Sequence, residues 1–398
     1  MPVDQQISDT IRQQFIAMQT KDGLLDVLNL AKSVLFEKGN ERPILLKALT
    51  WYGNTALQTK RYVSFSVPKK RGGVRTIHAP VTPLKVIQQC LNLVLQCVFT
   101  PNLAATGFVV GKNIADNARP HVGKHYVYNL DLKDFFTGID FQRVKACLKL
   151  PPFNLTGPHE PLAFLIANLC CVQHSDEPKR AFLPQGAPTS PILSNVICQQ
   201  LDRRLTGLAK RFGATYTRYA DDLTFSSYTN MYQPDGEFCR ELNRIITNQR
   251  FTINPSKTRL QKTGYRQEVT GLVVNERVNV SRRYIRTVRA LLNNWETLGY
   301  DEANQRFTEQ YKLNKGYVGE KPPGLLAVLG GKLDFLGMVR GRERGQEDAL
   351  YARYRQQFET LLSQTTDRKP VELEQILDIW EKNGIDKAMS LFERHKSL

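Results

Sequence analysis

Two acidic motifs, each beside a short strand pattern, constrain the fold of this chain more than any other feature. Residues Tyr126 to Leu130 alternate as a strand that delivers Asp131 to its end. Farther along, Thr215 to Tyr219 and Leu223 to Ser227 predict two strands, with Ala220-Asp221-Asp222 as the tip between them. An Asp-Asp step alone is usually a solvated turn. A hairpin that carries it beside a second strand ending in Asp presents acids to solvent and to metal ions.

The three carboxylates suit phosphoryl transfer onto a primer hydroxyl. Two Mg²⁺ ions can activate the hydroxyl and neutralise the leaving pyrophosphate, and both ions prefer oxygen ligands. We expect Asp131 and Asp221 to bridge the two ions, with Asp222 as a third, more weakly coupled carboxylate. The carbonyl of Leu132 is a further candidate ligand, whereas Asp134 fits a surface or structural acid. Together the motifs indicate a template-directed polymerase that uses two Mg²⁺ ions.

Residues around the acids suggest how a nucleotide is held. Phe136 follows Asp131 closely enough to press on a sugar and select deoxynucleotides (dNTPs), although it also fits a core aromatic beside Phe135. Gln185 and Gly186 lie in a loop between the acidic motifs, where glycine lets backbone approach a nucleotide or the template.

Basic residues supply candidates for contacts with phosphate. The stretch from Lys60 to Arg75 predicts a strand, a turn and a second strand with a basic tip. Lys69 and Arg75 fall on this element, and the guanidinium of Arg75 can grip phosphates with two hydrogen bonds. Lys257 is a candidate for protonating pyrophosphate, and it fits a surface lysine equally well. Arg282, Arg286 and Arg289 lie on one face of a predicted helix that suits a template–primer backbone.

Composition favours a polyanionic partner. The 398 residues carry 55 Lys and Arg against 38 Asp and Glu, a formal net charge of +17. The longest apolar run, Leu162 to Val172, is too short to span a bilayer, and the N-terminus does not resemble a signal peptide. The seven cysteines show no Cys-x-x-Cys spacing and are expected to be reduced thiols packed as small hydrophobes. We therefore expect a cytoplasmic protein without a membrane partner that handles nucleic acid.

These motifs, in this order, resemble the reverse transcriptases of bacteria, over roughly Tyr62 to Val274. Two further strings narrow the resemblance. Residues 117–121 contain Asn117 and His121 in the Asn-Ala-x-x-His pattern of retron reverse transcriptases. Val269, Thr270 and Gly271 match the Val-Thr-Gly signature of the same group, and the run from Val269 to Val274 predicts a single strand. The resemblance implies that both elements recognise a particular RNA.

The resemblance also implies an α+β right-hand polymerase with fingers, a palm built on a ferredoxin-like antiparallel sheet, and a helical thumb. Its predicted boundaries are 1–61 for an N-terminal helical region and the start of the fingers, 62–125 for the fingers, 126–275 for the palm with an interleaved fingers segment, 276–365 for the thumb and RNA-binding region, and 366–398 for a C-terminal helical extension. That extension fits a packing helix, a brace for the thumb or a dock for an effector.

For activity, the resemblance implies copying of a cognate structured noncoding RNA into cDNA. Priming is expected from an internal guanosine 2′-hydroxyl, giving the branched RNA–DNA hybrid called multicopy single-stranded DNA. The expected setting is defence against phage, with a separate effector protein. Residues 276–398 show no acidic cluster like an RNase H centre, so template removal is assigned to a host RNase H. The alternatives are a group II intron-type or other defence reverse transcriptase, or a catalytically silent RNA-binding scaffold.

Overall fold

The computed structural model describes residues 3–36, 42–54, 61–68, 72–174, 180–315, 322–343 and 346–366. The chain divides into two compact units, Met1–Val278 and Asn279–Leu398, which are described separately below. Two predictions lie outside the described residues, namely the basic tip residue Lys69 and all of the C-terminal extension beyond residue 366.

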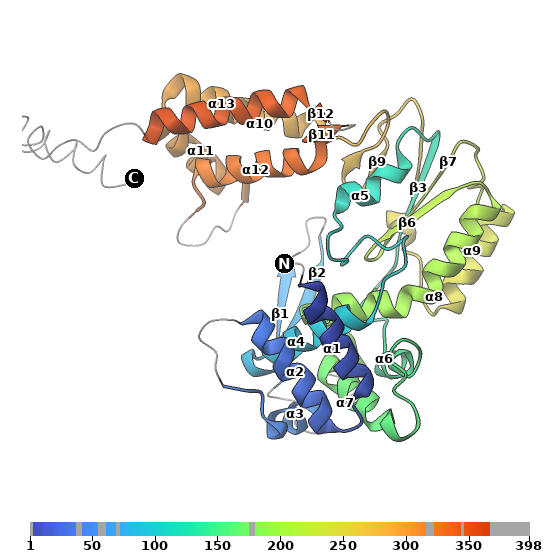
Figure 1. Cartoon of the computed structure of the whole chain (residues 1–398). Coiled ribbons are helices and arrows are strands. Elements are labelled where there is room, and N and C mark those ends of the chain that lie inside the picture. Colours follow the sequence, from blue (N-terminus) through green and yellow to red (C-terminus); the bar gives the residue numbers. More distant parts are fainter. Residues whose placement is uncertain are drawn as a thin grey trace, which may run out of the picture. The chain divides into compact units, whose positions relative to one another are not determined.

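The first unit contains an antiparallel sheet of four strands, beside which α8 (Ser190–Arg211) and α9 (Glu237–Asn248) lie (Figure 1). Its strands, in the order in which they lie side by side, are β6 (Thr215–Tyr219), β7 (Asp222–Ser227), β3 (Tyr126–Asp131) and β8 (Arg259–Lys262). Helices separate β3 from β6 and β7 from β8, which gives the β–α–β–β–α–β order of a ferredoxin-like sheet. The strands predicted around the acidic motifs are thus confirmed, and β7 begins at Asp222, one residue before the predicted start.

Helices pack beside this sheet and bury its apolar residues. The longest, α8, follows the Gln185-Gly186 loop, contacts β6 and packs against α9. Its N-cap is Thr189 and its first residue is Ser190, whose hydroxyl donates to the Pro184 carbonyl in the loop before the helix. The helices of this region are α6 (Phe141–Leu148), α7 (Glu160–Cys170), α8 (Ser190–Arg211) and α9 (Glu237–Asn248).

The N-terminal part of this unit is helical, as predicted, and carries one long hairpin. Helices α1 and α2 both pack on α4, and their buried residues join the same hydrophobic core as the helices beside the sheet. The hairpin pairs Tyr62 with Pro80 at its base and Pro68 with Val74 near its tip. The elements are α1 (Gln5–Ala17), α2 (Lys21–Leu35), α3 (Leu46–Gly53), β1 (Tyr62–Pro68), β2 (Val74–Pro80) and α4 (Thr82–Val98).

One strand prediction is wrong. The run Val269–Val274 predicted a single strand, but it forms a tight hairpin of β9 (Glu268–Val269) and β10 (Leu272–Val273). Thr270 and Gly271 take positive φ angles of 48° and 79° and reverse the chain between them. The hairpin contacts the short helix α5 (Ile114–Ala118), which continues into the 3₁₀ turn η2 (Arg119–His121). Other short elements are η3 (Gly157–His159), β4 (Val172–Gln173), β5 (Ala181–Phe182) and η4 (Pro255–Lys257).

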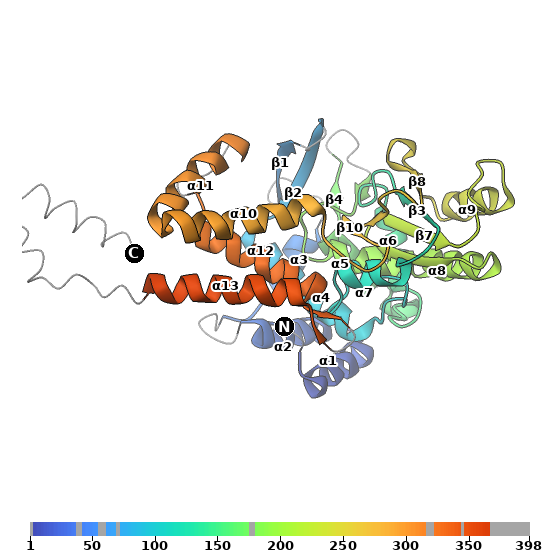
Figure 2. The same ribbon diagram turned by 90° about the horizontal axis from the view of Figure 1, so that it is seen from above.

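The second unit is mainly helical, and Figure 2 shows α10, α12 and α13 running alongside one another. Trp295 of α10 lies in its core, with its ring 5.7 Å from that of Phe358. Gly337 of α12 makes room for the ring of Tyr351, since a Cβ there would lie 2.8 Å from it. The elements are α10 (Arg282–Leu298), α11 (Tyr300–Lys315), α12 (Leu325–Arg340), β11 (Arg342–Glu343), β12 (Gln346–Glu347) and α13 (Ala349–Thr366).

Two further predictions concerned membrane-spanning segments and the state of the cysteines. Within the part of the chain that the structure describes, no helix is long and apolar enough to cross a membrane. All seven cysteines are free, and five of them are buried.

Candidate active site

Strand pairing sets two carboxylates face to face. Asp131, the last residue of β3, lies directly opposite Asp222, the first residue of β7. Directly opposed residues of an antiparallel pair point to the same face, with Cβ atoms roughly 4.5–5.5 Å apart, and like charges there repel. The register therefore brings two negative charges together at one end of the sheet.

The third carboxylate comes from the tight turn between β6 and β7. Tyr219 pairs with Asp222, which leaves Ala220 and Asp221 as the two turn residues. Ala220 takes a φ of 57°, a left-handed conformation that is uncommon outside glycine. The backbone of Leu132 donates to the Asp221 carbonyl at 3.0 Å, which holds the turn against the end of β3.

The acids are electrostatically strained without a counter-ion. Burial raises the pKa of Asp221, and the negative charge of Asp131 adds to this shift. The pKa of Asp222 rises to about 6, first because its carboxyl loses solvation and then because Asp221 and Asp131 repel it. Asp222 stays accessible, and a bound cation would relieve the part of this pKa shift that comes from repulsion by Asp221 and Asp131.

A lysine partly meets that need. The Nζ of Lys257, in the 3₁₀ turn η4, lies 2.8 Å from Oδ2 of Asp131. The amide of Asn254 donates to the other carboxylate oxygen at 3.1 Å. Sequence reasoning treated Lys257 as a contact for pyrophosphate or a surface lysine, whereas the structure places it as the ion-pair partner of Asp131.

The donor set fits Mg²⁺ in its chemistry. All three side chains offer hard oxygen ligands, and Leu132, the fourth predicted ligand, follows Asp131 with its side chain buried. Among the described residues, no three Asp, Glu, His or Cys side chains already form a metal-binding cluster. The fit rests on the opposed register of Asp131 and Asp222 and on the repulsion among the acids, which a bound cation would relieve.

A polar cavity of about 400 Å³ opens beside the acids. Asp131 and Asp222 line one part of it, and Lys257 and Arg259 add positive charge. Thr270 and Gly271, at the tip of the β9–β10 hairpin, complete the wall. The Thr270 hydroxyl donates to the Ile114 carbonyl, so this signature element is joined to the segment that precedes Asn117.

The other predicted nucleotide contacts converge from separate elements. Arg75 on β2 is exposed, and its positive charge offsets a small part of the rise that burial causes in the pKa of Asp221. The Gln185 carbonyl accepts from the backbone of His78 at 2.8 Å, which ties the loop to β2. Gly186 has a φ of 114°, and a Cβ there would lie 3.1 Å from the His78 carbonyl, so glycine is required for this close approach.

Phe136 is half-buried, and its ring contacts two other phenylalanines. The Phe135 ring lies edge-on at 5.2 Å, as expected of a core neighbour. The second contact is with Phe108, whose ring centroid lies 6.1 Å from that of Phe136. Phe108 is 38% exposed. Phe136 therefore retains an accessible part beside the acids' strand.

Three predicted RNA contacts, His121, Asn117 and Val269, need correction as direct contacts, because their side chains are fully buried. The ring of His121 is bound at both nitrogens, by Ser226 Oγ and Thr217 Oγ1, each at 2.7 Å. The Asn117 side chain accepts from the Thr106 hydroxyl at 2.7 Å. Val269 is also fully buried. These side chains brace the sheet from within, so an effect on RNA binding would have to act through their neighbours.

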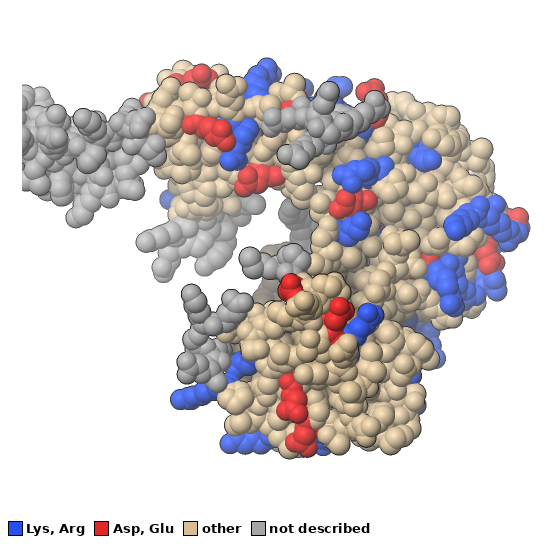
Figure 3. Space-filling model, in the orientation of Figure 1, with Lys and Arg blue, Asp and Glu red and all other residues tan. Residues whose placement is uncertain are grey.

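The basic helix face in the second unit is accessible. Arg282, Arg286 and Arg289 are all exposed on α10, while Val288 and Leu292 face the core. In the first unit, Lys and Arg side chains gather where α9 lies, with acidic side chains among them (Figure 3). Pairs such as Arg244 with Glu241 neutralise part of that cluster, which makes it a weaker surface for phosphates.

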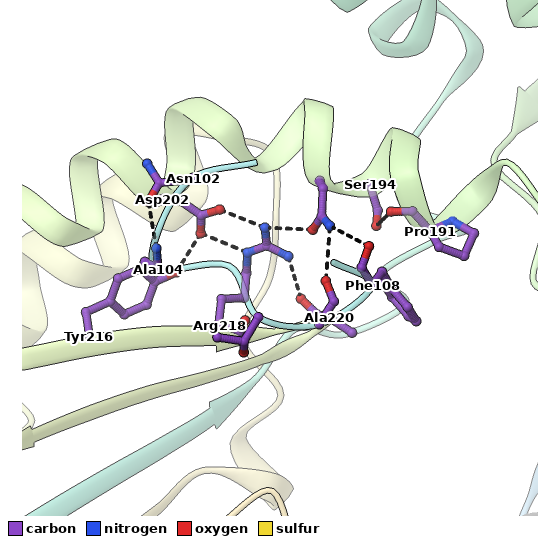
Figure 4. Close-up of polar contacts among 12 residues, drawn as sticks. Asn102, Ala104, Phe108, Pro191, Ser194, Asp202, Tyr216, Arg218 and Ala220 are labelled. Atoms are coloured by element: carbon purple, nitrogen blue, oxygen red, sulfur yellow. Dashed lines mark hydrogen bonds and ion pairs between the residues drawn. The ribbon is translucent and has the colours of Figure 1, made fainter. Parts of the chain in front are cut away.

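Sequence reasoning missed a buried polar network behind the acidic turn. The guanidinium of Arg218 on β6 makes two hydrogen bonds to Asp202 of α8, at 2.8 and 2.7 Å. Tyr216 donates to the same carboxylate, and Arg218 also donates to the Ala220 carbonyl at 3.0 Å (Figure 4). The available signal was polar residues on the apolar face of α8, where Asn195 and Asp202 lie two turns apart.

Comparison with known proteins agrees with this geometry. The family model described as "Reverse transcriptase (RNA-dependent DNA polymerase)" matches residues 67–284, more than half of the chain. That stretch contains all three acids and the whole four-stranded sheet. The fold and the site therefore define the chain as a reverse transcriptase.

Similar sequences narrow the class. The retron Mx65 reverse transcriptase of Myxococcus xanthus is 39% identical over 255 residues, 59% of this chain and 56% of that protein. The retron Ec86 reverse transcriptase of Escherichia coli is 32% identical over 237 residues, 58% of this chain and 69% of that protein. A solved structure of telomerase from Candida albicans aligns over 86% of this chain and 64% of that one, with 13% identity and a TM-score of 0.40, too low to support an inference. The chain belongs to the reverse transcriptase family and, within it, to the bacterial retron reverse transcriptases. It spans little more than half the length of the Myxococcus relative.

Proposed function

We propose that the chain is an RNA-directed DNA polymerase that copies a cognate structured noncoding RNA. Synthesis starts from an internal guanosine 2′-hydroxyl and yields branched multicopy single-stranded DNA, which serves with a separate effector in defence against phage. A host RNase H removes the copied template. The observation that carries the proposal is the register of Asp131 against Asp222, with Asp221 in the adjoining turn.

The site residues take distinct roles in this proposal. Asp131, Asp221 and Asp222, with the Leu132 carbonyl, hold two Mg²⁺ ions, which supply activation of the primer hydroxyl and neutralisation of pyrophosphate. Arg75 and Lys69 contact the triphosphate, Gln185 and Gly186 position the nucleotide, and Phe136 excludes a ribose 2′-hydroxyl. Lys257, the ion-pair partner of Asp131, also contacts pyrophosphate in this proposal.

The assignment of subdomains follows from these roles. The β1–β2 hairpin belongs to the fingers, the four-stranded sheet is the palm of a right-hand polymerase, and the helices from α10 onward form the thumb. Arg282, Arg286 and Arg289 grip the template–primer backbone, and the Thr270-Gly271 tip lies beside the acids as a contact for the cognate RNA.

Sequencing of the nucleic acid that copurifies with the full chain tests the proposal. RNase and debranching-enzyme treatments are compared in parallel, and Asp221→Asn serves as the matched protein. A discrete DNA joined to RNA by a 2′,5′ linkage, absent from Asp221→Asn although the RNA is retained, is the expected result. Unbranched, heterogeneous cDNA would favour an intron-type or other defence enzyme, and RNA without any DNA would favour a silent scaffold.

A further inference from the structure

Two strained turns meet behind the acidic motif. Phe108 and Ala220 have φ angles of 60° and 57°, in the left-handed region that residues other than glycine rarely adopt. The turns touch directly, because a Cβ on Gly107 would lie 2.4 Å from the Ala220 nitrogen. Strained conformations of this kind persist only where the surrounding structure fixes them, and they cluster at functional sites.

One buried relay fixes both turns. Arg218 donates to the Ala220 carbonyl and to Oδ1 of Asn195, each at 3.0 Å. The Asn195 amide group then donates to the Gly107 carbonyl at 3.0 Å and approaches the Phe108 carbonyl at 3.5 Å. Arg218 and Asn195 are at most 1% exposed. The connection from Arg218 toward Ala220 and Phe108 can be followed in Figure 4.

This hydrogen-bond network ends beside Phe136, the proposed sugar gate, which is the ring that excludes a ribose 2′-hydroxyl. The ring of Phe108 contacts that of Phe136 with centroids 6.1 Å apart and planes tilted by 43°. Phe108 lies in a loop and Phe136 follows β3, so the two rings meet only because the loop is held against the sheet. Both rings keep exposed surface, since Phe108 is 38% exposed and Phe136 is half-buried.

We infer that Phe108 is a second specificity-determining residue of this polymerase, which backs the Phe136 ring against a ribose 2′-hydroxyl, and that Asn195 is the positioning residue that fixes Phe108. The inference rests on the proposed function. A single ring discriminates against one extra hydroxyl only if it cannot swing away, and Phe108 removes the space into which Phe136 would move. Because Asn195 is also bound to Arg218, the gate and the metal-binding turn are held in one register.

The test measures kcat/KM for a dNTP and for the matching ribonucleotide, with the full chain, Mg²⁺ and a primed RNA template. The variants are Phe108→Ala, Phe136→Ala, their double variant and Asn195→Ala, with Ser194→Ala as the control. Ser194 is a buried neighbour on α8 whose hydroxyl donates only to the Pro191 carbonyl of the same helix. A general loss of stability lowers both kcat/KM values together, so their ratio isolates the gate.

We expect Phe108→Ala to lower the preference for dNTPs by about two- to twelvefold, the range that one aromatic contact supplies. Asn195→Ala changes the ratio in the same direction, Ser194→Ala leaves it at the wild-type value, and the double variant is no less selective than Phe136→Ala alone.

Wild-type selectivity in Phe108→Ala, together with relaxed selectivity in Phe136→Ala, would overturn the inference and leave the polymerase assignment intact. Full selectivity in an active Phe136→Ala would overturn the gate itself and this inference with it. No DNA synthesis by the wild-type chain would overturn the proposed function. Because Phe108 is partly exposed, its variant decides the matter even if Asn195→Ala does not fold.

Discussion

The Nζ atom of Lys257 lies 2.8 Å from Oδ2 of Asp131, so a lysine that is 53% exposed neutralises a carboxylate that is only 7% exposed. The ammonium thus occupies a position on Asp131 that a divalent cation would compete for. This pairing explains how the chain tolerates three acids at one end of a sheet in the absence of metal.

Replacing Lys257 with Met therefore destabilises the metal-free protein more than the metal-bound one. Because solvent screens the exposed lysine, the pair itself contributes at most about 1 kcal/mol, which corresponds to a fall in Tm of roughly 2–4 °C for a unit of this size. Thermal unfolding in EDTA and in excess Mg²⁺ measures the effect, and Lys262→Met, on the exposed edge of β8, is the control. An equal fall in Tm under both conditions would show that Lys257 does not stand in for a cation.

The raised pKa of Asp222 predicts a pH dependence with a definite sign. The folded protein holds a proton on Asp222 up to about pH 6, whereas the unfolded chain loses it near pH 4. The metal-free protein therefore loses stability as the pH rises from about 4 to 6, and the loss persists above that window. Asp222→Asn removes this loss and is more stable than wild type at pH 7 by at most about 1 kcal/mol, given solvent screening.

Urea denaturation in EDTA at several pH values tests this expectation. The difference in unfolding free energy between Asp222→Asn and wild type should shrink as the pH falls from 6 to 4, and Mg²⁺ should reverse its sign at pH 7. A difference that stays constant from pH 4 to pH 7 would mean that Asp222 is not crowded by its neighbours.

Gly107 lies so close to the acidic turn that a side chain at this position is expected to disturb the acids. A Cβ there would meet the Ala220 nitrogen at 2.4 Å, so Gly107→Ala must displace the turn that carries Asp221. We expect DNA synthesis to fall by at least about tenfold, because a shift of 1 Å at reacting groups can cost far more. Steady-state synthesis on a primed RNA template measures the loss.

Gly207→Ala is the matched control, since Gly207 lies within α8 and a Cβ there meets nothing within 4 Å. That variant should keep wild-type synthesis and gain about 0.4–1 kcal/mol in unfolding free energy. Wild-type synthesis by Gly107→Ala would show that the loop yields instead of the turn.

The sequence predicted the carboxylates because strand alternation and a turn signal are local. The ends of β3, β6 and β7 follow from runs of five or six residues. The prediction of a single strand in place of the β9–β10 hairpin failed for the same reason. Val269 and the residues from Leu272 onward read as one apolar strand, and only Gly271 hinted at the turn.

Burial of the polar residues could not be predicted, because their partners are distant in the chain. His121 is bound by Thr217 and Ser226, and Asn117 by Thr106, contacts that exist only once the segment before α5 lies along β6. A signature string matched by resemblance does not distinguish a residue that contacts RNA from one that shapes the surface. Phe108 gave no signal at all, since phenylalanine is not a residue type that indicates a left-handed backbone.

The exposed arginine face of α10 predicts broad RNA binding that depends on salt. Changing Arg282, Arg286 and Arg289 together to Glu removes up to three phosphate contacts, which lowers the log–log salt slope by about 2–3. RNA affinity measured over a salt series tests this, with Arg306→Glu on α11 as a single-site control. An unchanged slope would move the grip on the backbone to another surface.

Burial of His121 predicts an acid-sensitive fold. Desolvation lowers the pKa of His121 to about 3, so the folded protein keeps this ring neutral while the unfolded chain takes up a proton below about pH 6.5. The unfolding free energy therefore falls by about 1.4 kcal/mol per pH unit from this group as the pH drops through that window.

His121→Gln costs stability at pH 7, because two hydrogen bonds inside the sheet are lost, but it lacks this acid sensitivity. The two denaturation curves should converge between pH 6.5 and pH 4, whereas His125→Gln, at an exposed position, should run parallel to wild type. Parallel curves for His121→Gln would mean that the ring is protonated in the folded protein, and the buried contacts with Thr217 and Ser226 would then have to be those of a charged donor.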